Sequence, residues 1–405
     1  MDWQSGQRWQ PSAENKLVRI ALLCLSRHGG TLLCGRRLAS AIAKIKGLNL
    51  AYIGSKEASY GSKDDLDSTE IPKLVVSTGS SKLGNVLQTL YLSNYKKILE
   101  LIASLVPDIV HFAAPHAWNV ILGIGLRRFP LICTIHDPSR HLGAQSSLYA
   151  GLAAVQVALA DRIIVLSQAH RTSLTRYGKP ESRLNVIHHG ELGSSKPFHP
   201  IPHNRQLLFF GRIEQYKGLD ILVDAFHIAK QSQPELSLVI AGRGKLSKKI
   251  ADMNGTRDIK IYNRWLSDEE LNQLCLASDL VVLPYIEATQ SGVAAKAQAL
   301  GRPVIVTSVG GLPEQIEDGI SGSIVPPNSV NALARAIGAL LQDEKRLSEM
   351  SRAAWNLYKC RYDWDSIASE TVKAYERARE DRLTFGPTRL TAGLRAFLSG
   401  ALSRR

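Results

Sequence analysis

The feature that most constrains the fold is an alternation of short apolar, β-branched runs with longer helical patterns along nearly the whole chain. The first cycle has an apolar run at residues 18–25, a loop at 26–30 and a helical pattern that continues through 38–45. Such alternation is typical of βαβ units, in which crossover helices join parallel strands. The sequence therefore predicts an α/β fold with mostly parallel sheets.

The alternation occurs in two series. In the first half, further strands are predicted at 108–112, 131–135, 163–166 and 185–187. The pattern restarts after a proline-rich stretch at 196–202, and the second series of expected strands lies at 206–210, 236–241, 259–262, 280–283, 303–307 and 322–325. A chain of 405 residues is long enough for two domains that each bury a core. We predict two Rossmann-like domains facing a central cleft.

The predicted domain organisation has four parts. They are a polar N-terminal tail at 1–16, a first Rossmann-like domain at 17–196, a second at 197–360, and C-terminal helices at 361–405 that return toward the first domain. The chain past Asp343 is expected to be helical throughout.

Charge and cysteine usage limit the possible partners and compartments. Fifty Lys and Arg against 36 Asp and Glu give a formal charge of +14, which favours an anionic partner such as nucleic acid, anionic lipid or a phosphorylated small molecule. A basic surface that only aids solubility is the alternative. The five cysteines show no CxxC spacing, so neither a disulfide framework nor a zinc site is indicated. With no long apolar segment and no apolar core near the N-terminus, we expect a cytoplasmic protein.

The C-terminal stretch 384–405 combines apolar spacing with positive charge. Its apolar residues at helical spacing are Leu390, Leu394, Phe397, Leu398 and Ala401, and its cations include Arg389, Arg395, Arg404 and Arg405. This pattern favours a helix lying on an anionic membrane surface. The alternative is a terminal helix packed on the body of the protein.

Three segments that follow predicted strands of the second half carry features that phosphate groups require. Gly211, Arg212 and Lys217 combine backbone freedom, a guanidinium and an ammonium, although two solvated surface cations would give the same pattern. Gly242 follows the next strand at the carboxyl edge, where ligands of open α/β sheets bind. The third segment, 291–293, opens an alanine-rich helix whose N-terminal N–H groups favour an anion; Ser291 as a simple N-cap is the alternative.

The order of these motifs resembles that of a known family. The segments that carry the resemblance are Gly211–Gly218, Ala241-Gly242, Pro284–Val293, Ala299–Ile305, Val309–Glu314 and Asp318-Gly319. They look like the donor domain of GT-B glycosyltransferases, more narrowly the retaining group 1 enzymes that build bacterial polysaccharides and lipid-linked saccharides. The resemblance extends from about Val18 to Tyr375 and is more specific in the second half.

The resemblance implies roles for individual residues of the second domain. Arg212 and Lys217 would bind the donor diphosphate and stabilise the departing nucleoside diphosphate, without a metal or other cofactor. Residues near the phosphate and sugar would be Gly211, Gly242, Gln290, Ser291, Gly292 and Val293. Arg264 and Trp265 fall where the family holds the nucleobase, with packing as the alternative for Trp265. Asp65 and Asp67 have the spacing of a metal motif, but in a polar loop we interpret them as a solvated cluster.

In the first domain, Gly29 and Gly30 match the glycine loop that approaches donor and acceptor. His136 matches the histidine beside the transferred sugar; a structural histidine after a strand is the alternative.

The chain departs from the family at a pair of glutamates that are usually seven residues apart. Those positions are Ala288 and Lys296, with Glu287 one position away from the first. A lysine cannot accept hydrogen bonds from ribose hydroxyls as a carboxylate does. Lys296 is four residues after Gly292 on one helical face, so it is interpreted as extending either toward phosphate or into solvent. The departure leaves open a change in donor choice or a loss of activity.

The function predicted from these features is transfer of a sugar from a nucleoside-diphosphate donor to a hydroxyl of a saccharide or lipid-linked acceptor. Retention of configuration, a role in cell-surface polysaccharide synthesis and a position at the inner face of the plasma membrane are expected with it. The alternative is a non-catalytic nucleotide-sugar-binding or scaffold protein of the same fold. Nucleic-acid binding is disfavoured because no reader motif accompanies the charge. A dinucleotide-dependent dehydrogenase is disfavoured because the first strand is not followed by GxGxxG.

Overall fold

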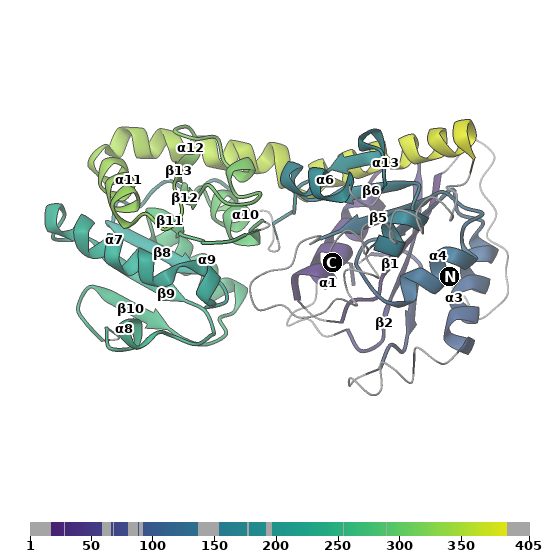
Figure 1. Cartoon of the computed structure of the whole chain (residues 1–405), viewed down its shortest axis with the longest axis horizontal. Helices are drawn as coiled ribbons and strands as arrows, with labels where there is room; N and C mark the ends of the chain where they lie inside the picture. Colours follow the sequence, from purple (N-terminus) through teal and green to yellow (C-terminus); the bar gives the residue numbers. More distant parts are fainter. Residues whose placement is uncertain are drawn as a thin grey trace, which may run out of the picture. The chain divides into compact units, whose positions relative to one another are not determined.

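The chain forms two α/β units, shown in a computed structural model (Figure 1). The structure describes residues 18–27, 29–58, 66–67, 69–79, 88, 92–136, 154–175, 178–191, 197–253, 255–288 and 290–386. Unit 1 contains the described residues up to His188 and again from Trp364 onward, and unit 2 contains those from His189 to Asp363. The chain thus changes unit at 188/189 and 363/364, where sequence patterns placed the boundaries at 196/197 and 360/361.

Unit 1 is built on a seven-stranded parallel sheet with the order β3-β2-β1-β4-β5-β6-β7. Its strands are β1 Val18–Cys24, β2 Leu48–Ser55, β3 Lys73–Val76, β4 Ile109–Phe112, β5 Leu131–Ile135, β6 Arg162–Val165 and β7 Leu184–Val186. Its helices are α1 Gly29–Ala43, α3 Leu92–Leu105, α4 Trp118–Gly125, α6 Gln168–Thr175 and α13 Trp364–Phe385, with a 3-10 turn η2 at Glu181–Arg183.

Alternate residues of the central strand β1 enter two different cores. Ala21 and Leu23 pack with apolar residues of α3 and α4, whereas Ile20 and Leu22 pack with those of α1 and α13. Successive side chains of a strand point to opposite faces of the sheet, so a continuous apolar run indicates a strand that is covered on both sides. The run at 18–25 in the sequence therefore marks the middle of a sandwich of helices around a sheet.

Helix α13 follows unit 2 in the sequence but belongs to unit 1. Its Tyr375 Oη lies 2.8 Å from Nδ1 of the fully buried His111. Near its end, Arg382 donates to both carboxylate oxygens of the buried Asp161 at 3.1 and 3.2 Å. Charge pairs with several hydrogen bonds fix orientation as well as contact, so these bonds specify where α13 docks.

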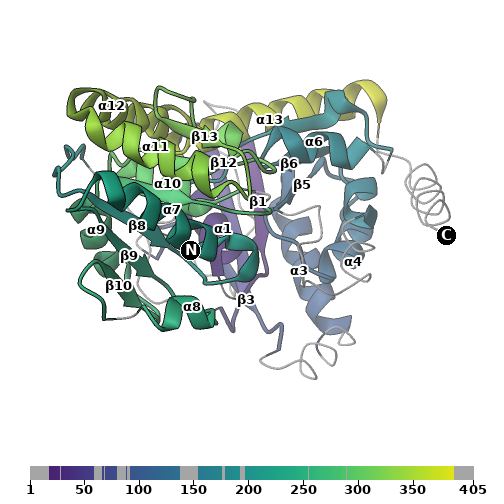
Figure 2. The ribbon, with the colours of Figure 1, turned by 60° about the vertical axis from the view of Figure 1, so that its left-hand side comes forward.

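Unit 2 is built on a six-stranded parallel sheet with the order β10-β9-β8-β11-β12-β13. Its strands are β8 Gln206–Phe210, β9 Ser237–Ala241, β10 Ile259–Tyr262, β11 Leu280–Leu283, β12 Val304–Thr307 and β13 Gly322–Val325. Its helices are α7 Leu219–Ser232, α8 Lys248–Ala251, α9 Asp268–Ala277, α10 Gly292–Ala299, α11 Val330–Gln342 and α12 Glu344–Arg361, with 3-10 turns η3 Gln215–Lys217 and η4 Pro313–Gln315. Figure 2 shows the same elements from another side.

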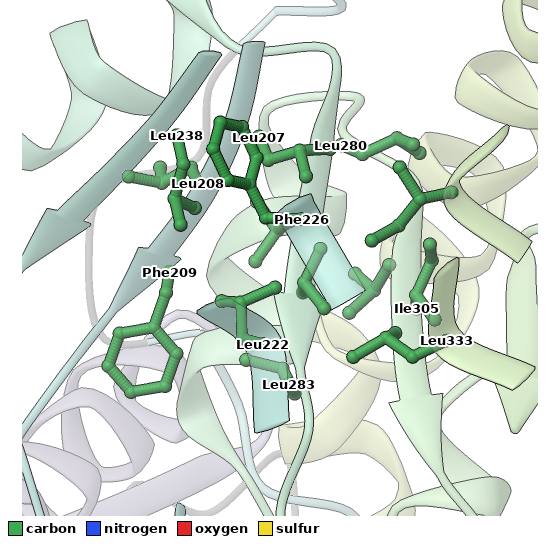
Figure 3. Packing of buried hydrophobic residues seen from close by; sticks show 14 of the residues in the cluster. Leu207, Leu208, Phe209, Leu222, Phe226, Leu238, Leu280, Leu283, Ile305 and Leu333 are labelled. Carbon is green, nitrogen blue, oxygen red and sulfur yellow. The ribbon is translucent and has the colours of Figure 1, made fainter. Parts of the chain in front are cut away.

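The core of unit 2 is one large cluster of strand and helix side chains (Figure 3), with a smaller one between α10 and α12. Leu208 of β8 and Leu280 of β11 are fully buried, as are Leu222 and Phe226 of α7. Burial of this kind contributes roughly 1.5 to 3 kcal/mol for each large aliphatic side chain. The strands of this unit are therefore held rigidly, and the loops at their carboxyl ends start from fixed positions.

The predicted strands of the second half match the structure within one residue at each end. Two strands of unit 1, β2 and β3, were missed from the sequence. β2 contains Asn49 and Gly54 within its apolar residues, and β3 has only four residues after Pro72, so neither gives a clear β-branched run. The expected helical region after Asp343 is confirmed as α12 and α13 up to Phe385. The predicted tail at 1–16 and all but the first three residues of 384–405 lie outside the described residues. Among the helices in the described ranges, none is both long and apolar enough to cross a membrane.

Candidate functional site

The strand order of unit 2 reverses between β8 and β11, and we call the place where the loops after these two strands diverge the crevice. From β8 the chain proceeds outward through β9 to β10, and it then returns to the other side of β8 to form β11. At such a reversal the loops that leave neighbouring strands diverge, and ligands of open α/β sheets bind there. The loop after β8 carries Gly211 to Lys217, and the loop after β11 leads into α10. The sheet topology therefore brings two of the three predicted phosphate segments together.

Lys217 is a buried cation at this crevice. Its residue is 8% exposed, and its Nζ donates to Tyr285 Oη at 2.8 Å and lies 4.3 Å from the centre of the Tyr285 ring. Within the part of the chain that the structure describes, no carboxylate forms an ion pair with Lys217. A buried charge without an opposite charge is unfavourable. The site is therefore electrostatically prepared for an anion.

The N-terminus of α10 lies beside this lysine. Ser291 is its N-cap: the Ser291 Oγ accepts a hydrogen bond from Val293 N at 3.3 Å and lies 3.4 Å from Tyr285 Oη. Gln315 holds the cap from the other side, since its Oε1 accepts from Ser291 N at 2.7 Å and its Nε2 donates to Ser291 O at 2.9 Å. The structure thus shows the capping role that was the alternative for Ser291, and the helix dipole adds positive potential at the same point.

Gly211 connects the lysine and the helix. Its φ of +120° is in the region that favours glycine, and a Cβ at this position would lie 3.5 Å from Lys217 Nζ and 3.3 Å from Val293 Cγ2. Gly242 belongs to a different contact: a Cβ there would lie 1.8 Å from Gly211 O. Gly242 therefore lets the loop after β9 approach the loop after β8, which positions Gly211.

The other predicted residues around the crevice are less closely grouped. The side chain of Arg212 is mostly exposed, with its Nη1 3.8 Å from Glu214 Oε1. The segment containing Glu287 is docked on η3 through its backbone, because Ile286 N donates to Tyr216 O at 2.7 Å. Gln290 is half-buried next to the Ser291 cap. Arg212 is thus close to the crevice in sequence, but its side chain is directed to the surface.

Arg264 and Trp265 follow β10 at the same edge of the sheet. Arg264 Nη2 lies 2.6 Å from Glu270 Oε1, and Glu270 also forms a capping box with Ser267 at the start of α9. The hydrogen bond from Arg264 and the one from the Ser267 backbone lower the pKa of Glu270 to about 2. Trp265 is 66% exposed, so the packing interpretation of this residue is wrong. Its ring is accessible for stacking.

The structure corrects the interpretation of Lys296. This residue is 6% exposed, and its Nζ lies 3.4 Å from Asp268 Oδ1 and 3.7 Å from Glu191 Oε1. It extends neither into solvent nor to an open phosphate position, because two carboxylates compensate its charge. The local helical pattern could not show this, since Glu191 comes from the segment just after the change of units.

Three predicted residues lie in unit 1. Gly29 and Gly30 are the first residues of α1, after β1. His136 follows β5, and its Nε2 lies 2.9 Å from Ala113 O, a carbonyl that can only accept. Nε2 therefore carries a proton in this contact. These residues lie at the carboxyl edge of the unit 1 sheet, while the residues around Lys217 belong to unit 2.

Sequence reasoning missed several residues that shape the crevice. Tyr285 contacts both Lys217 and Ser291, Gln315 holds the helix cap, and Glu191 compensates Lys296. A signal existed for the first two, since both lie within or next to segments that carried the family resemblance. Nothing in the sequence near Glu191 indicated its partner. Among the described residues, no group of three or more His, Cys, Asp or Glu is arranged to hold a metal ion.

Comparison with known protein families gives two matches that fall in different halves of the chain. Residues 59–190 match the model described as Glycosyltransferase Family 4, and residues 204–343 match Glycosyl transferases group 1. Together they span most of both units.

Two bacterial proteins are similar to the chain in sequence. The chain is 29% identical over 290 residues to glycogen synthase of Mycobacterium tuberculosis, which covers 67% of this chain and 69% of the relative. It is 30% identical over 248 residues to D-inositol 3-phosphate glycosyltransferase of Streptomyces avermitilis, covering 55% of this chain and 53% of the relative.

Solved structures share the fold. HepE of Anabaena, in complex with UDP and glucose, aligns with a TM-score of 0.67 at 20% identity over 89% of this chain and 99% of its own. Sucrose-phosphate synthase from Thermosynechococcus elongatus aligns with the same TM-score and identity, over 98% of its own chain. The predicted architecture of two Rossmann-like domains with parallel sheets is confirmed.

Proposed function

Because the chain belongs to the group 1 glycosyltransferases of GT-B fold, we propose that it transfers a sugar from a nucleoside-diphosphate sugar to a hydroxyl acceptor with retention of configuration. The observation that carries the donor assignment is Lys217, a buried cation without a carboxylate partner in the described part of the chain, beside the N-terminus of α10. A diphosphate supplies the missing negative charge. That HepE, a structural neighbour, binds UDP and UDP-glucose supports this class of donor.

The chemistry proposed for the crevice is stabilisation of a leaving group. When the bond between sugar and diphosphate breaks, negative charge accumulates on the departing diphosphate, and fixed positive groups lower the barrier most where that charge develops. Lys217 Nζ and the N-terminus of α10 are such groups. Arg212 is proposed to rotate from the surface to the diphosphate. Its contact with Glu214 is 3.8 Å long and joins two exposed side chains, so it opposes this rotation only weakly. These groups perform the role without a metal ion.

The acceptor side is assigned by resemblance. We propose that His136, Gly29 and Gly30 of unit 1 contact the transferred sugar or the acceptor, and that the acceptor is a saccharide or a lipid-linked saccharide. The basic charge of the chain supports a peripheral position on an anionic membrane surface facing the cytoplasm, in the synthesis of a cell-surface polysaccharide.

The decisive experiment compares Lys217→Ala with Lys345→Ala, a matched change of an exposed lysine in the same unit. Wild type and Lys345→Ala should be stabilised by a nucleoside diphosphate in a thermal-shift screen across nucleotides, by about 2.7 kcal/mol at a hundredfold excess over Kd. Lys217→Ala should lose that stabilisation and show kcat for sugar transfer reduced by about 10² to 10³. The assignment would be contradicted if Lys217→Ala kept full turnover and showed the same nucleotide-induced rise in melting temperature as wild type.

The same screen separates catalysis from binding alone. A chain that binds a nucleoside diphosphate in the calorimeter, but neither transfers sugar nor hydrolyses any donor, would be a nucleotide-sugar-binding protein of this fold. The Lys217→Ala variant would then lose binding while no variant affects turnover.

A further inference from the structure

Helix α4 of unit 1 has an inverted pattern of polarity. Its eight residues, WNVILGIG, include one polar side chain, and that residue, Asn119, is buried. Asn119 Nδ2 donates to Ala114 O at 2.8 Å and to Gln156 Oε1 at 3.0 Å. The outward positions are apolar instead: Ile121 is 41% exposed and Ile124 is 52% exposed. A surface helix normally directs polar residues outward, so this face is suited to an apolar environment.

Positive charge surrounds this apolar face. Arg127 and Arg128 follow α4 directly, and Arg128 is exposed. Helix α3 lies beside α4 (Figures 1 and 2), with the two helices in close contact where Gly125 meets Leu99. One turn before Leu99, α3 exposes Lys96 and Lys97.

Lys96 is the cation of this face that has a carboxylate nearby. Lys96 forms a surface pair with Glu100 at 3.6 Å, in which both side chains are more than 60% exposed. This pair is neutral overall, so the excess positive charge of the face comes from Lys97 and Arg128, which form no ion pair within the part of the chain that the structure describes. Exposed isoleucines bordered by lysine and arginine are the combination that binds anionic lipid: the apolar side chains enter the interface and the cations contact the headgroups.

We propose that the α3–α4 face, defined by Lys96, Lys97, Ile121, Ile124 and Arg128, is a docking surface for an anionic lipid membrane. The charge of the face selects the membrane over an uncharged partner, and its two isoleucines give shallow insertion. The inference rests on the membrane position in the proposed function and names the surface that makes the contact. Vesicle binding is measured without donor or acceptor, so its failure is distinct from a failure of the donor assignment.

Flotation of the full chain with vesicles tests the proposal. The chain should float with phosphatidylcholine vesicles that contain 30% phosphatidylglycerol and remain unbound with phosphatidylcholine alone. The double variant Ile121→Ser/Ile124→Ser should bind at least about tenfold more weakly. Lys97→Gln/Arg128→Gln should bind about thirtyfold more weakly, because each cation near the surface contributes about 1 kcal/mol.

Matched controls come from unit 2. Ile228→Ser/Ile320→Ser removes two exposed isoleucines, and Lys248→Gln/Arg346→Gln removes two exposed cations. Both should float like wild type, and all variants should keep the wild-type melting temperature. Equal loss in the face and control variants would overturn the proposal, as would wild-type binding in the face variants.

Two further outcomes assign the face to another occupant and also overturn the proposal. Binding lost only on deletion of 387–405 would place the membrane contact in that segment. A wild-type chain that ignores vesicles and self-associates in light scattering, with association lost in Ile121→Ser/Ile124→Ser, would assign the face to a second copy.

Discussion

Two buried lysines of unit 2 show how the same residue type acquires opposite electrostatic roles. Lys217 is near the helix cap at Ser291 with a tyrosine hydroxyl as its hydrogen-bond partner, and Lys296 lies between Glu191 and Asp268. An uncompensated cation attracts an anionic ligand, whereas a compensated one mainly fixes the elements that carry its partners. Lys217 is therefore the candidate for ligand binding, and Lys296 the candidate for holding α10 to α9 and to the segment at Glu191.

Replacement of Lys296 should destabilise unit 2. Lys296→Met removes the cation 3.7 Å from the buried Glu191, and removal of one partner of a buried pair costs about 3 to 5 kcal/mol. Urea denaturation should show this loss, and Lys296→Glu should be worse, because it would place three carboxylates together. Adding Glu191→Gln to Lys296→Met should recover a large part of the loss. If Lys296→Met and Lys296→Glu both unfolded at the same urea concentration as wild type, the Lys296–Glu191 pair would not contribute to stability.

Among the elements, the position of helix α13 depends on contacts with residues that are far away in the sequence. Tyr375 bonds His111, which in turn lies 2.8 Å from Thr134 Oγ1. Burial, with a contribution from the charge of His136, lowers the pKa of His111 to about 3. The ring is therefore neutral at pH 7 and joins α13 to β4 and β5 through two hydrogen bonds.

The stability of the chain should consequently depend on pH through His111. In the unfolded chain this histidine takes up a proton near pH 6.5, and in the folded chain it does not do so until about pH 3. Between these values the unfolded state binds more protons, so the free energy of unfolding falls as pH falls. His111→Asn should reduce that slope by up to about 1.4 kcal/mol per pH unit, measured by urea denaturation at pH 4 to 7. A slope in His111→Asn equal to that of wild type would contradict this assignment.

In the whole molecule, the two units differ in whether their cores come from one continuous part of the chain. Unit 2 draws its buried apolar residues from 201–362, one continuous part of the chain. Unit 1 places Ile367, Ala368 and Tyr375 of α13 in the same cluster as residues of β1 and α1. Its core is therefore incomplete until the end of the chain has been made.

This difference predicts unequal behaviour of fragments. A fragment 189–363 should fold cooperatively, with the circular dichroism and dispersed NMR spectrum of an α/β domain. A fragment 18–188 should aggregate or unfold at lower urea, because its apolar α13-binding surface is exposed, and joining 364–386 to it should restore stability. A fragment 18–188 as stable as the joined version would show that α13 contributes nothing to the fold of unit 1.

Local sequence patterns were sufficient to predict the class of fold, most of the strands and the family. Strand and helix patterns are local: burial on both faces requires an apolar run, and the runs at 206–210 and 280–283 coincide with β8 and β11. The weaker patterns of β2 and β3 were missed for the same reason, since polar or short strands give little local signal.

The partners of the buried polar groups could not be predicted, because they come from distant parts of the chain. Arg382 and Asp161 are 221 residues apart in sequence, and Tyr375 and His111 are 264 apart. The sequence placed Lys217 and Lys296 among residues that contact phosphate, but it could not distinguish them, because the compensation of a charge depends on carboxylates brought near by folding. Their separation into an open cation and a paired one follows from the position of Glu191 and Asp268 in space.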